Sequence, residues 1–561
     1  MNKNCKNCQQ IFEITESDLG FYDKISPVFP ANGTGTGKKF LFPEPSLCPD
    51  CRQQRRLAFR NERKLYKRKC DATGKEIISI YSADKPYKVF DQGEWWSDRW
   101  DGLDYGREFD FGKSFFAQFN ELLLKVPRLS VFSRNSVNSD YTNYEEKDKN
   151  CYLCFAGGFS EDCMHCYSQI FCKNCVDCSL INHSELCYEC LKLENCYQCF
   201  YVQNSQNCNN CYLGMDLIGC SNCFGCCGLR NKIYYIFNKA YSKEDYEKEI
   251  KNLLLKIKSK EILDKFEKLS LKISRKYAHI LKSEDCSGDF ILNSQNCDFC
   301  FDVSDGKDSK FMTNSDDFRD CYDCDHAQLP ADLVYDSQSV CLGCYMNAFC
   351  NYCWTTNNSL YCDSCHYSKN LFGCVGLKHR EYCVFNKQYT KEEYEQLVPK
   401  IIQHMIKIGE WGEFYPISIS PFAYNETVAQ EYFPLTKEEA FSKGYKWKDE
   451  DINEKPVYTK VDVPEFIGDV SDDIVREILT CESCGKNYKI IPQELKFYRN
   501  MNLPIPRRCP DCRHKERIAL RNPRKLWKRN CMKCGVGIET TYAPAREEVV
   551  YCEKCYLESL V

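Results

Sequence analysis

Residues 151–199 of the chain read CYLCFAGGFSEDCMHCYSQIFCKNCVDCSLINHSELCYECLKLENCYQC. A cysteine recurs every twelve residues in this stretch, and the series continues beyond it: Cys151, Cys163, Cys175, Cys187, Cys199, Cys211 and Cys223. A fixed short period is the signature of stacked structural units. Twelve residues can close one small coil of a β-solenoid, whose thin interior admits only small side chains such as cysteine. The stretch therefore predicts a β-solenoid-like array.

Two more series share this period. One contains Cys154, Cys166, Cys178 and Cys190, and the other contains Cys172, Cys196, Cys208 and Cys220, with Ser160 and Ser184 filling its gaps. A packed coil tolerates serine in place of cysteine, whereas a zinc site that loses one thiolate fails. We therefore favour packed thiols. A string of zinc knuckles and a set of redox-active C-x-x-C pairs stay open as alternatives.

An aromatic residue often follows the periodic cysteine, as in Tyr152, Tyr188, Tyr197, Phe200, Tyr212 and Phe224. Neighbours on a strand point to opposite faces. Cysteines inside the coil therefore predict an aromatic ladder outside it.

A second cysteine-rich array follows, and the end of the first is duplicated there. CCGLRNKIYYIFNKAYSKEDYEKEI (226–250) pairs with CVGLKHREYCVFNKQYTKEEYEQLV (374–398). Each copy closes an array and opens a helical pattern, one from Ser242 to about Leu281 and a shorter one from Thr390. Ser242 and Thr390 are each followed three residues later by an acid, which resembles a capping box. We expect these helices to cover the arrays or each other.

The two ends of the chain also match each other. CPDCRQQRRLAFRNERKLYKRKC (48–70) aligns with CPDCRHKERIALRNPRKLWKRNC (509–531), and another C-x-x-C pair precedes each copy. Two such pairs supply the four soft ligands that tetrahedral zinc prefers. A knuckle, a hairpin and a helix carrying the second pair predict a treble clef at each end. The expected ligands are Cys5, Cys8, Cys48 and Cys51, and Cys481, Cys484, Cys509 and Cys512.

A second zinc module follows the C-terminal treble clef. Its pairs are separated by 17 residues, a spacing typical of a zinc ribbon, and its expected ligands are Cys531, Cys534, Cys552 and Cys555. The N-terminal copy of this ribbon is degenerate, with Cys70, Thr73, Asp91 and Glu94 at the aligned positions. One thiolate, one hydroxyl and two carboxylates are a poor zinc set.

We expect this degenerate ribbon to persist without metal around an aromatic core that includes Trp95, Trp96 and Trp100. The alternative is a weak site formed by Cys70, Asp91 and Glu94. The N-terminal treble clef also contains the insertion NGTGTGKK, which we interpret as a flexible loop because it lacks the phosphate-loop pattern.

Basic residues follow the second cysteine pair of each treble clef. A basic stripe beside a zinc module is a nucleic-acid footprint, and arginine forks suit phosphates. The candidate nucleic-acid-binding residues are Arg52, Arg55, Arg56, Arg60, Arg513, Arg517, Arg521 and Lys525. Two alternatives stay open: these side chains pair with acids elsewhere in the chain, or they meet an acidic protein partner.

Composition narrows the setting. The chain has 561 residues, 43 cysteines and a formal net charge of −4. An odd number of cysteines, mostly in C-x-x-C pairs, fits metal binding in a reducing compartment better than a disulfide framework. The first residues lack the apolar core of a signal peptide, and no long apolar run is present. We expect a cytoplasmic protein without a membrane segment.

Catalysis is not indicated by the sequence. The chain has only eight histidines, and no Cys/His/Asp set can be assembled from their order. Zinc held by four cysteines leaves no open coordination position for a substrate. We expect no enzymatic activity and no small-molecule substrate.

These patterns predict a multidomain, mainly β protein with small α+β zinc modules at both ends. Five parts are expected: a treble clef with a degenerate ribbon (1–130), a first repeat array with a long helix (131–285), a second array with a helix (286–410), a linker or docking segment (411–475), and a treble clef with a zinc ribbon (476–561).

The stretch CESCGKNYKIIPQELKFYRNMNLPIPRRCPDCRHKER (481–517) resembles the probable zinc-ribbon (treble-clef) domain family. The shared features are the two C-x-x-C pairs, Phe497-Tyr498, Pro506-Arg507 and Arg513. The resemblance implies zinc binding by the four cysteines. The family has no established activity that could be carried over to this chain. The whole layout resembles uncharacterised zinc-ribbon proteins of candidate-phyla bacteria.

The function expected from the sequence is a non-enzymatic scaffold with three structural zinc ions. Its treble-clef helices are expected to contact nucleic acid, RNA before DNA. The first alternative is a protein-interaction scaffold that uses the aromatic ladders, and the second is a thiol–disulfide redox protein.

Overall fold

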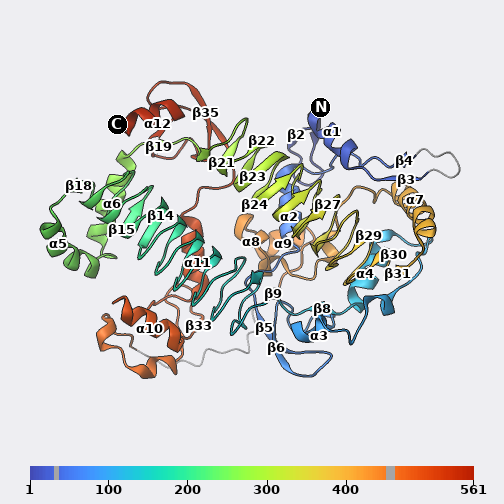
Figure 1. Cartoon of the computed structure of the whole chain (residues 1–561), viewed down its shortest axis with the longest axis horizontal. Coiled ribbons are helices and arrows are strands. Elements are labelled where there is room, and N and C mark those ends of the chain that lie inside the picture. Colours follow the sequence, from blue (N-terminus) through green and yellow to red (C-terminus); the bar gives the residue numbers. More distant parts are fainter. Residues whose placement is uncertain (31–36, 450–461, 561) are drawn as a thin grey trace.

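The computed structural model describes residues 1–30, 37–449 and 462–560 (Figure 1). It is a multidomain, mainly β structure with some helices, and groups of four cysteines lie near both ends. Most of the glycine-rich insertion predicted to be flexible, residues 31–36, lies outside the described residues. None of the described helices is both long and apolar enough to cross a membrane.

The first array is a stack of short parallel strands, shown in teal and green in Figure 1. Paired residues are twelve positions apart, as Tyr167 and Ser179 or Ser179 and Leu191. An antiparallel strand ends the sheet. The strands are β9 (Ser133–Arg134), β10 (Glu145–Glu146), β11 (Tyr167–Ile170), β12 (Ser179–Asn182), β13 (Leu191–Glu194), β14 (Phe200–Gln206), β15 (Asn209–Met215), β16 (Ser221–Phe224), β17 (Ile233–Ile236) and β18 (Lys239–Ala240).

Every third residue of the coil is left-handed. In one turn of the first array these residues are Asn174, Asp177, Leu180 and His183, with φ between 45° and 57°. The residue after each is buried: Cys175, Cys178, Ile181 and Ser184. A left-handed residue turns the backbone sharply, so four such turns close one twelve-residue coil around four inward side chains. The cysteine periods identify three of these four inward columns.

The fourth inward column has no regular chemistry that the sequence could reveal. It contains Gln169, Ile181, Leu193, Ser205 and Leu217, all of which are buried. Aliphatic and polar residues are mixed here, and no single residue type marks the column.

Backbone carbonyls explain why serine and cysteine exchange within a column. The thiol of Cys187 lies 3.4 Å from the carbonyl oxygen of Glu185 and 3.8 Å from that of Cys196. Ser184 donates to the carbonyl of Asn182 at 2.8 Å and accepts a hydrogen bond from the backbone N–H of Cys196 at 3.1 Å. Both side chains lie within hydrogen-bond distance of the carbonyl two residues earlier.

The second array repeats this arrangement, with a one-residue offset in part of it. Asp325 pairs with Gln338 thirteen residues later, whereas Lys369 pairs with Glu381 after twelve. Its strands are β19 (Arg275–Lys276), which pairs outside the array, β20 (Ile280–Leu281), β21 (Gly288–Leu292), β22 (Gln295–Asp298), β23 (Cys300–Lys310), β24 (Thr313–Arg319), β25 (Asp325–Asp332), β26 (Gln338–Cys341), β27 (Cys344–Tyr345), β28 (Asn351–Trp354), β29 (Lys369–Phe372), β30 (Glu381–Val384) and β31 (Lys387–Gln388).

The duplicated FNK sequence closes both arrays. Strand β17 turns into β18, and β30 turns into β31, as antiparallel hairpins. Asn386 is left-handed, and its side-chain amide bonds both the N–H (2.8 Å) and the carbonyl (2.7 Å) of Val375 in the preceding coil. Asn238 makes the same pair of bonds with Cys227. The asparagine thus covers the last open coil, as a capping repeat must.

The helices after the arrays differ in part from the prediction. The single helix expected from Ser242 to about Leu281 is two helices, α5 (Lys243–Leu255) and α6 (Lys260–Lys272), followed by strand. Ser259 occupies the N-cap of α6 and breaks the pattern, because serine favours caps over helix interiors. Thr390 forms the expected capping box at the start of α7 (Lys391–Ile408). The buried face of α7 packs in the largest core cluster.

The two ends of the chain have matching elements. The N-terminal elements are β1 (Asn2–Asn4), β2 (Ile11–Glu13), α1 (Glu16–Ile25), β3 (Val28–Pro30), β4 (Gly37–Lys39), α2 (Pro49–Leu57), β5 (Tyr66–Lys69), β6 (Glu76–Ser79), β7 (Val89–Phe90), α3 (Gln92–Trp95), α4 (Phe115–Lys125) and β8 (Arg128–Leu129). The C-terminal elements are β32 (Leu479–Thr480), β33 (Asn487–Tyr488), α10 (Pro492–Asn500), α11 (Pro510–Ala519), β34 (Trp527–Asn530), β35 (Gly537–Thr540), β36 (Val550–Tyr551) and α12 (Glu553–Ser559).

The segment before the C-terminal elements packs on the N-terminal ones. It contains two short helices, α8 (Ala429–Tyr432) and α9 (Lys437–Ser442). Leu57 and Ala58 share a core cluster with Tyr424, Val428 and Ala440. The segment expected to be a linker or docking piece therefore supplies part of the core around α2.

Most of the predicted aromatic ladder is covered. Tyr188, Phe200, Tyr212 and Phe224 are buried in a cluster shared with α5, α6 and α10, whereas Tyr197 is exposed. The ring of Tyr188 lies 6.1 Å from that of Phe497 and 5.9 Å from that of Tyr498. These rings therefore join the array to other parts of the same chain.

Cys172 tests the packing of the inward columns, because its column contains serine in the neighbouring coils at Ser160 and Ser184. We expect Cys172→Ser to cost less than about 1 kcal/mol, since the hydroxyl can donate to the same carbonyl of Ile170. Cys172→Leu should cost about 1–3 kcal/mol by overpacking. Urea unfolding midpoints compare the two variants. Equal and large losses for both would contradict this packing.

Candidate metal centres

Three groups of four cysteines bring their sulfur atoms together. The N-terminal cluster is Cys5, Cys8, Cys48 and Cys51; the C-terminal cluster is Cys481, Cys484, Cys509 and Cys512; the terminal cluster is Cys531, Cys534, Cys552 and Cys555. Within each group the sulfurs lie within 4.8 Å of one another.

Sulfur separations match what a metal with four thiolate ligands requires. The measured distances are 3.6 Å for Cys8–Cys48, 3.7 Å for Cys484–Cys509 and 3.7 Å for Cys534–Cys552. Tetrahedral zinc with bonds of about 2.3 Å places its sulfurs about 3.8 Å apart. Each group can hold a metal ion such as zinc with little rearrangement.

The first pair of each group lies on a tight turn. In the C-terminal cluster, the N–H of Gly485 donates to the carbonyl of Cys481 at 2.9 Å, and the N–H of Cys481 donates to Lys486 at 2.9 Å. Gly485 is left-handed at φ 71°, a conformation that glycine adopts without strain. Gly535 has the same role in the terminal cluster, at φ 78°. The N-terminal cluster uses the non-glycine residue Gln9, at φ 62°.

The second pair of each group lies at a helix start. Cys48, Cys509 and Cys552 are the N-cap residues of α2, α11 and α12. The free N–H groups and dipole of a helix N-terminus stabilise thiolates. Proline follows Cys48 and Cys509 at the first helical position, where its missing N–H has no partner to lose.

Backbone amides favour the thiolate form at one cysteine of each group. Burial raises the pKa of Cys481, but N–H donors from Cys509, Cys484 and Ser483 outweigh burial and lower the pKa to about 6. The pKa values of Cys5 and Cys531 are lowered to about 6 in the same way. These side chains are therefore ready to ligate a cation near neutral pH.

The degenerate ribbon keeps its knuckle without four sulfurs. The N–H of Gly74 donates to the carbonyl of Cys70 at 2.8 Å, as at the intact sites. The Asp91 carboxylate accepts from Thr73 at 3.4 Å and caps α3 by accepting from the N–H of Glu94 at 3.0 Å. Trp95 is fully buried beside Cys70, and Trp96 and Trp100 pack against this core. Hydrogen bonds and aromatic packing thus occupy the place of a metal.

Most of the proposed nucleic-acid residues are inside the protein, which differs from the exposed basic surface that we expected. Arg513 pairs with Asp177 of the first array, and Arg517 pairs with the same carboxylate at 2.9 Å and with Glu189 at 3.2 Å. Both arginines are at most 3% exposed. Arg513 and Arg517 therefore follow the alternative considered from the sequence, in which these side chains pair with acids elsewhere in the chain.

The N-terminal arginines are placed in the same way, against the second array. Arg52 pairs with Asp323, and Arg56 pairs with Asp325 at 2.9 Å and with Asp336 at 2.6 Å. Arg52 and Arg56 are at most 3% exposed.

The remaining candidates range from buried to exposed. Arg60 is buried and pairs with Glu62 at 2.5 Å, and half-buried Arg55 pairs with Asp336. Half-buried Arg521 donates to the hydroxyl of Tyr432 at 3.0 Å. Lys525 is exposed. Of the eight candidate residues, Lys525 alone is exposed to solvent without an ion pair in the described part of the chain.

The array acids that receive these arginines were missed from the sequence. Asp177 and Glu189 stand twelve residues apart at left-handed positions of consecutive coils, and Asp323 and Asp336 stand in two consecutive coils as well. A signal was present, because acids spaced by the coil period must form an outward row. Nothing in the sequence, however, marked which outward row would be covered.

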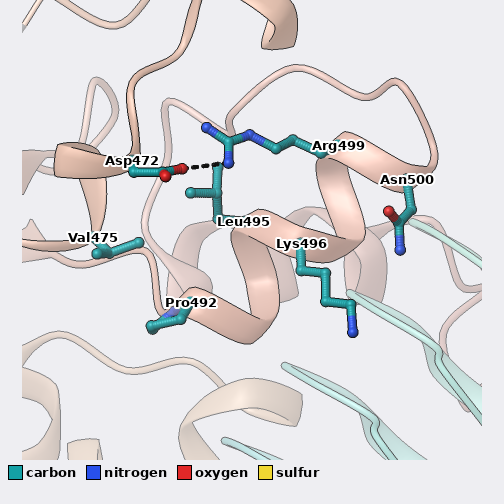
Figure 2. Close-up of a pocket in the computed structure, with 7 residues that line it drawn as sticks. All are labelled: Asp472, Val475, Pro492, Leu495, Lys496, Arg499 and Asn500. Atoms are coloured by element: carbon teal, nitrogen blue, oxygen red, sulfur yellow. Dashed lines mark hydrogen bonds and ion pairs between the residues drawn. The ribbon is translucent and has the colours of Figure 1, made fainter.

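One hollow of about 270 Å³ lies beside α10 and is shown in Figure 2. Asp472, Val475, Pro492, Leu495, Lys496, Arg499 and Asn500 line it. Arg499 and Asp472 form an ion pair across it, and the other side chains are apolar stems or exposed polar tips (Figure 2). Its lining contains no cysteine or histidine that could serve as a nucleophile or metal ligand.

No model of a known protein family matches the sequence, and a search of curated proteins found no match.

The degenerate ribbon provides a direct test of the metal geometry. We expect the triple variant Thr73→Cys, Asp91→Cys and Glu94→Cys to bind one zinc ion more than the native chain, because the backbone of the knuckle and the helix start are already in place. Elemental analysis of the purified proteins measures this. The single variant Thr73→Cys is the control and should leave the zinc content unchanged. An unchanged content in the triple variant would contradict the geometric equivalence.

Proposed function

We propose that the protein is a zinc-dependent, non-enzymatic structural scaffold. In this proposal three zinc ions occupy the N-terminal, C-terminal and terminal clusters, where treble clefs and a zinc ribbon would form around them. The observation that carries the proposal is that the sulfurs of each cluster already stand 3.6–3.7 Å apart at the pairs measured. Four thiolate ligands in two C-x-x-C pairs support zinc as the ion.

The central arrays would act as β-solenoid bodies that the zinc modules brace. Twelve-residue strand register, four inward columns and a capping hairpin support this part of the proposal. No disulfide joins the array cysteines that the structure describes, and thiols such as those of Cys187 and Cys190 donate to backbone carbonyls, which suits packing rather than metal ligation. Free thiols in such number also favour a reducing, cytoplasmic setting.

Closed clusters argue for a structural role. Zinc held by four sulfurs has no coordination position for water or substrate. The second cysteine pairs continue into α2 and α11, whose arginines are buried in ion pairs with the arrays. A metal at each cluster would thus fix the helix start that positions these arginines.

Metal content tests the proposed function. We expect three zinc ions per chain after purification without added metal, and progressive loss of structure at the two ends on treatment with a strong chelator. Elemental analysis combined with limited proteolysis measures both. A chain that contains no zinc, or whose ends keep their resistance to proteolysis after metal removal, would contradict the proposal.

Nucleic-acid contact, RNA before DNA, is a second candidate, carried by exposed lysines of which only Lys525 was among the residues first considered. Lys67 on β5 and Lys528 on β34 occupy equivalent places after the two cluster helices. Lys67, Lys525 and Lys528 are exposed, and none of them forms an ion pair within the described residues. Lysines of this kind act as point charges toward phosphates.

Charge reversal tests this second candidate. If the wild-type chain binds single-stranded RNA, we expect Lys67→Glu with Lys528→Glu to weaken binding at least tenfold, with a shallower salt dependence, since each lost phosphate contact removes about 0.7 from the slope. Fluorescence anisotropy at several salt concentrations measures this. The control is Lys248→Glu with Lys268→Glu on exposed faces of α5 and α6. Equal weakening by both pairs, or no wild-type binding, would contradict the candidate.

A further inference from the structure

Helices α2 and α11, which start at the N-terminal and C-terminal clusters, occupy equivalent positions in the duplicated sequence. Arg52 and Arg56 of α2 align with Arg513 and Arg517 of α11. Each pair follows its second C-x-x-C by the same number of residues, so one face of each helix carries two guanidinium groups about one turn apart.

Each guanidinium pair meets the same kind of receptor. Arg517 bridges Asp177 and Glu189, which are left-handed residues of consecutive coils in the first array. Arg56 lies 3.8 Å from Asp323 and 2.6 Å from Asp336, which are left-handed residues of consecutive coils in the second array. The second pair of acids is separated by one extra residue, the same offset seen in the strand register there.

Helices α1 and α10, which precede α2 and α11, also occupy equivalent positions. Tyr22 of α1 aligns with Tyr498 of α10. The ring of Tyr22 lies 5.1 Å from that of Tyr335 in the second array, and the ring of Tyr498 lies 5.9 Å from that of Tyr188 in the first. Tyr188 and Tyr335 each stand one residue before the second acid of their receptor. The two docking surfaces are therefore equivalent in charged and aromatic contacts.

The connections between these surfaces are crossed. Helix α2 precedes the first array in the chain but contacts β25 of the second, whereas α11 follows the second array but contacts β12 of the first (Figure 1). The strands that follow these helices are not crossed. Val89 of β7 pairs with Arg128 of β8, just before the first array. At the equivalent position, Val550 of β36 pairs with Arg275 of β19, just before the second array.

We propose that the chain consists of two equivalent units, the second circularly permuted, whose helices α2 and α11 are exchanged, so that the N-terminal cluster and its metal latch the second array and the C-terminal cluster and its metal latch the first. The sites assigned here are a carboxylate receptor on the first array, Asp177 and Glu189, and its equivalent on the second, Asp323 and Asp336. Each receptor takes the paired guanidinium groups of a metal-fixed helix. This inference rests on zinc occupying the clusters, as proposed above.

Metal occupancy controls the latch because the ligands and the arginines share one helix. Cys512 is a cluster member, and Arg513 is the next residue. When the metal leaves, the start of α11 loses its anchor, and Arg513 and Arg517 separate from their carboxylates. Asp177 is fully buried, so it then lacks a counter-ion and local opening of those coils is favoured. The effect reaches an array remote in sequence.

Hydrogen exchange on the full-length, zinc-loaded protein tests the crossing. Cys484→Ser removes a ligand of the C-terminal cluster, and Cys8→Ser is the matched change in the N-terminal cluster. We expect Cys484→Ser to speed exchange at least tenfold in β12 and β13 and to leave β24 and β25 unchanged, and Cys8→Ser to give the reverse pattern. Loosening of the array nearer in sequence, or of both arrays alike, would overturn the inference.

A reciprocal measurement covers the case in which a ligand variant does not fold. Linkage requires that the receptor affect the metal as the metal affects the receptor. We expect Asp177→Asn to weaken zinc binding at least tenfold at the C-terminal cluster alone, and Asp323→Asn at the N-terminal cluster alone, in equilibrium competition with a chelator. Cysteine alkylation mapped by mass spectrometry identifies the emptied cluster. Unchanged or uncrossed release would overturn the latch, whereas wild-type protein without zinc would overturn the proposed function itself.

Discussion

The narrow interior of the twelve-residue coil is the constraint on which the rest of the structure depends. Left-handed residues at every third position leave four inward side chains per turn, as in Cys175, Cys178, Ile181 and Ser184. Small thiols fill this space and satisfy backbone carbonyls without large cavities. Because the period is fixed, outward side chains fall into straight rows. The rows give the rest of the chain regular surfaces of aromatic rings and carboxylates on which to pack.

The rows of carboxylates explain how short terminal modules become part of a large body. Arg513 and Arg517 are buried against Asp177, and removal of one partner from a buried ion pair costs about 3–5 kcal/mol. Such a pair specifies one orientation more than it adds net stability. Small domains need a metal or similar constraint to fix a helix. A metal held by the cysteine clusters at the starts of α2 and α11 would supply that constraint at the point where orientation matters.

The sequence predicts these features to different extents. The twelve-residue cysteine series anticipates the strand register, and paired C-x-x-C motifs anticipate which sulfurs meet, because both are short-range regularities. Burial of Arg52 and Arg517 could not be inferred, since helix charge alone does not show whether the facing surface is water or Asp323 and Asp177. The break at Ser259 was overlooked because apolar spacing continues on both sides of it.

The central claim is that metal is held by the cysteines at the two ends while the array thiols are only packed. Alkylation of native protein, before and after brief chelation, with each cysteine mapped by mass spectrometry, tests it most directly. The account predicts that chelation opens the N-terminal, C-terminal and terminal clusters to labelling, while inward thiols such as Cys175 and Cys187 stay protected until the chain unfolds. Labelling of the inward thiols as soon as metal is removed, with the end clusters unchanged, would contradict it.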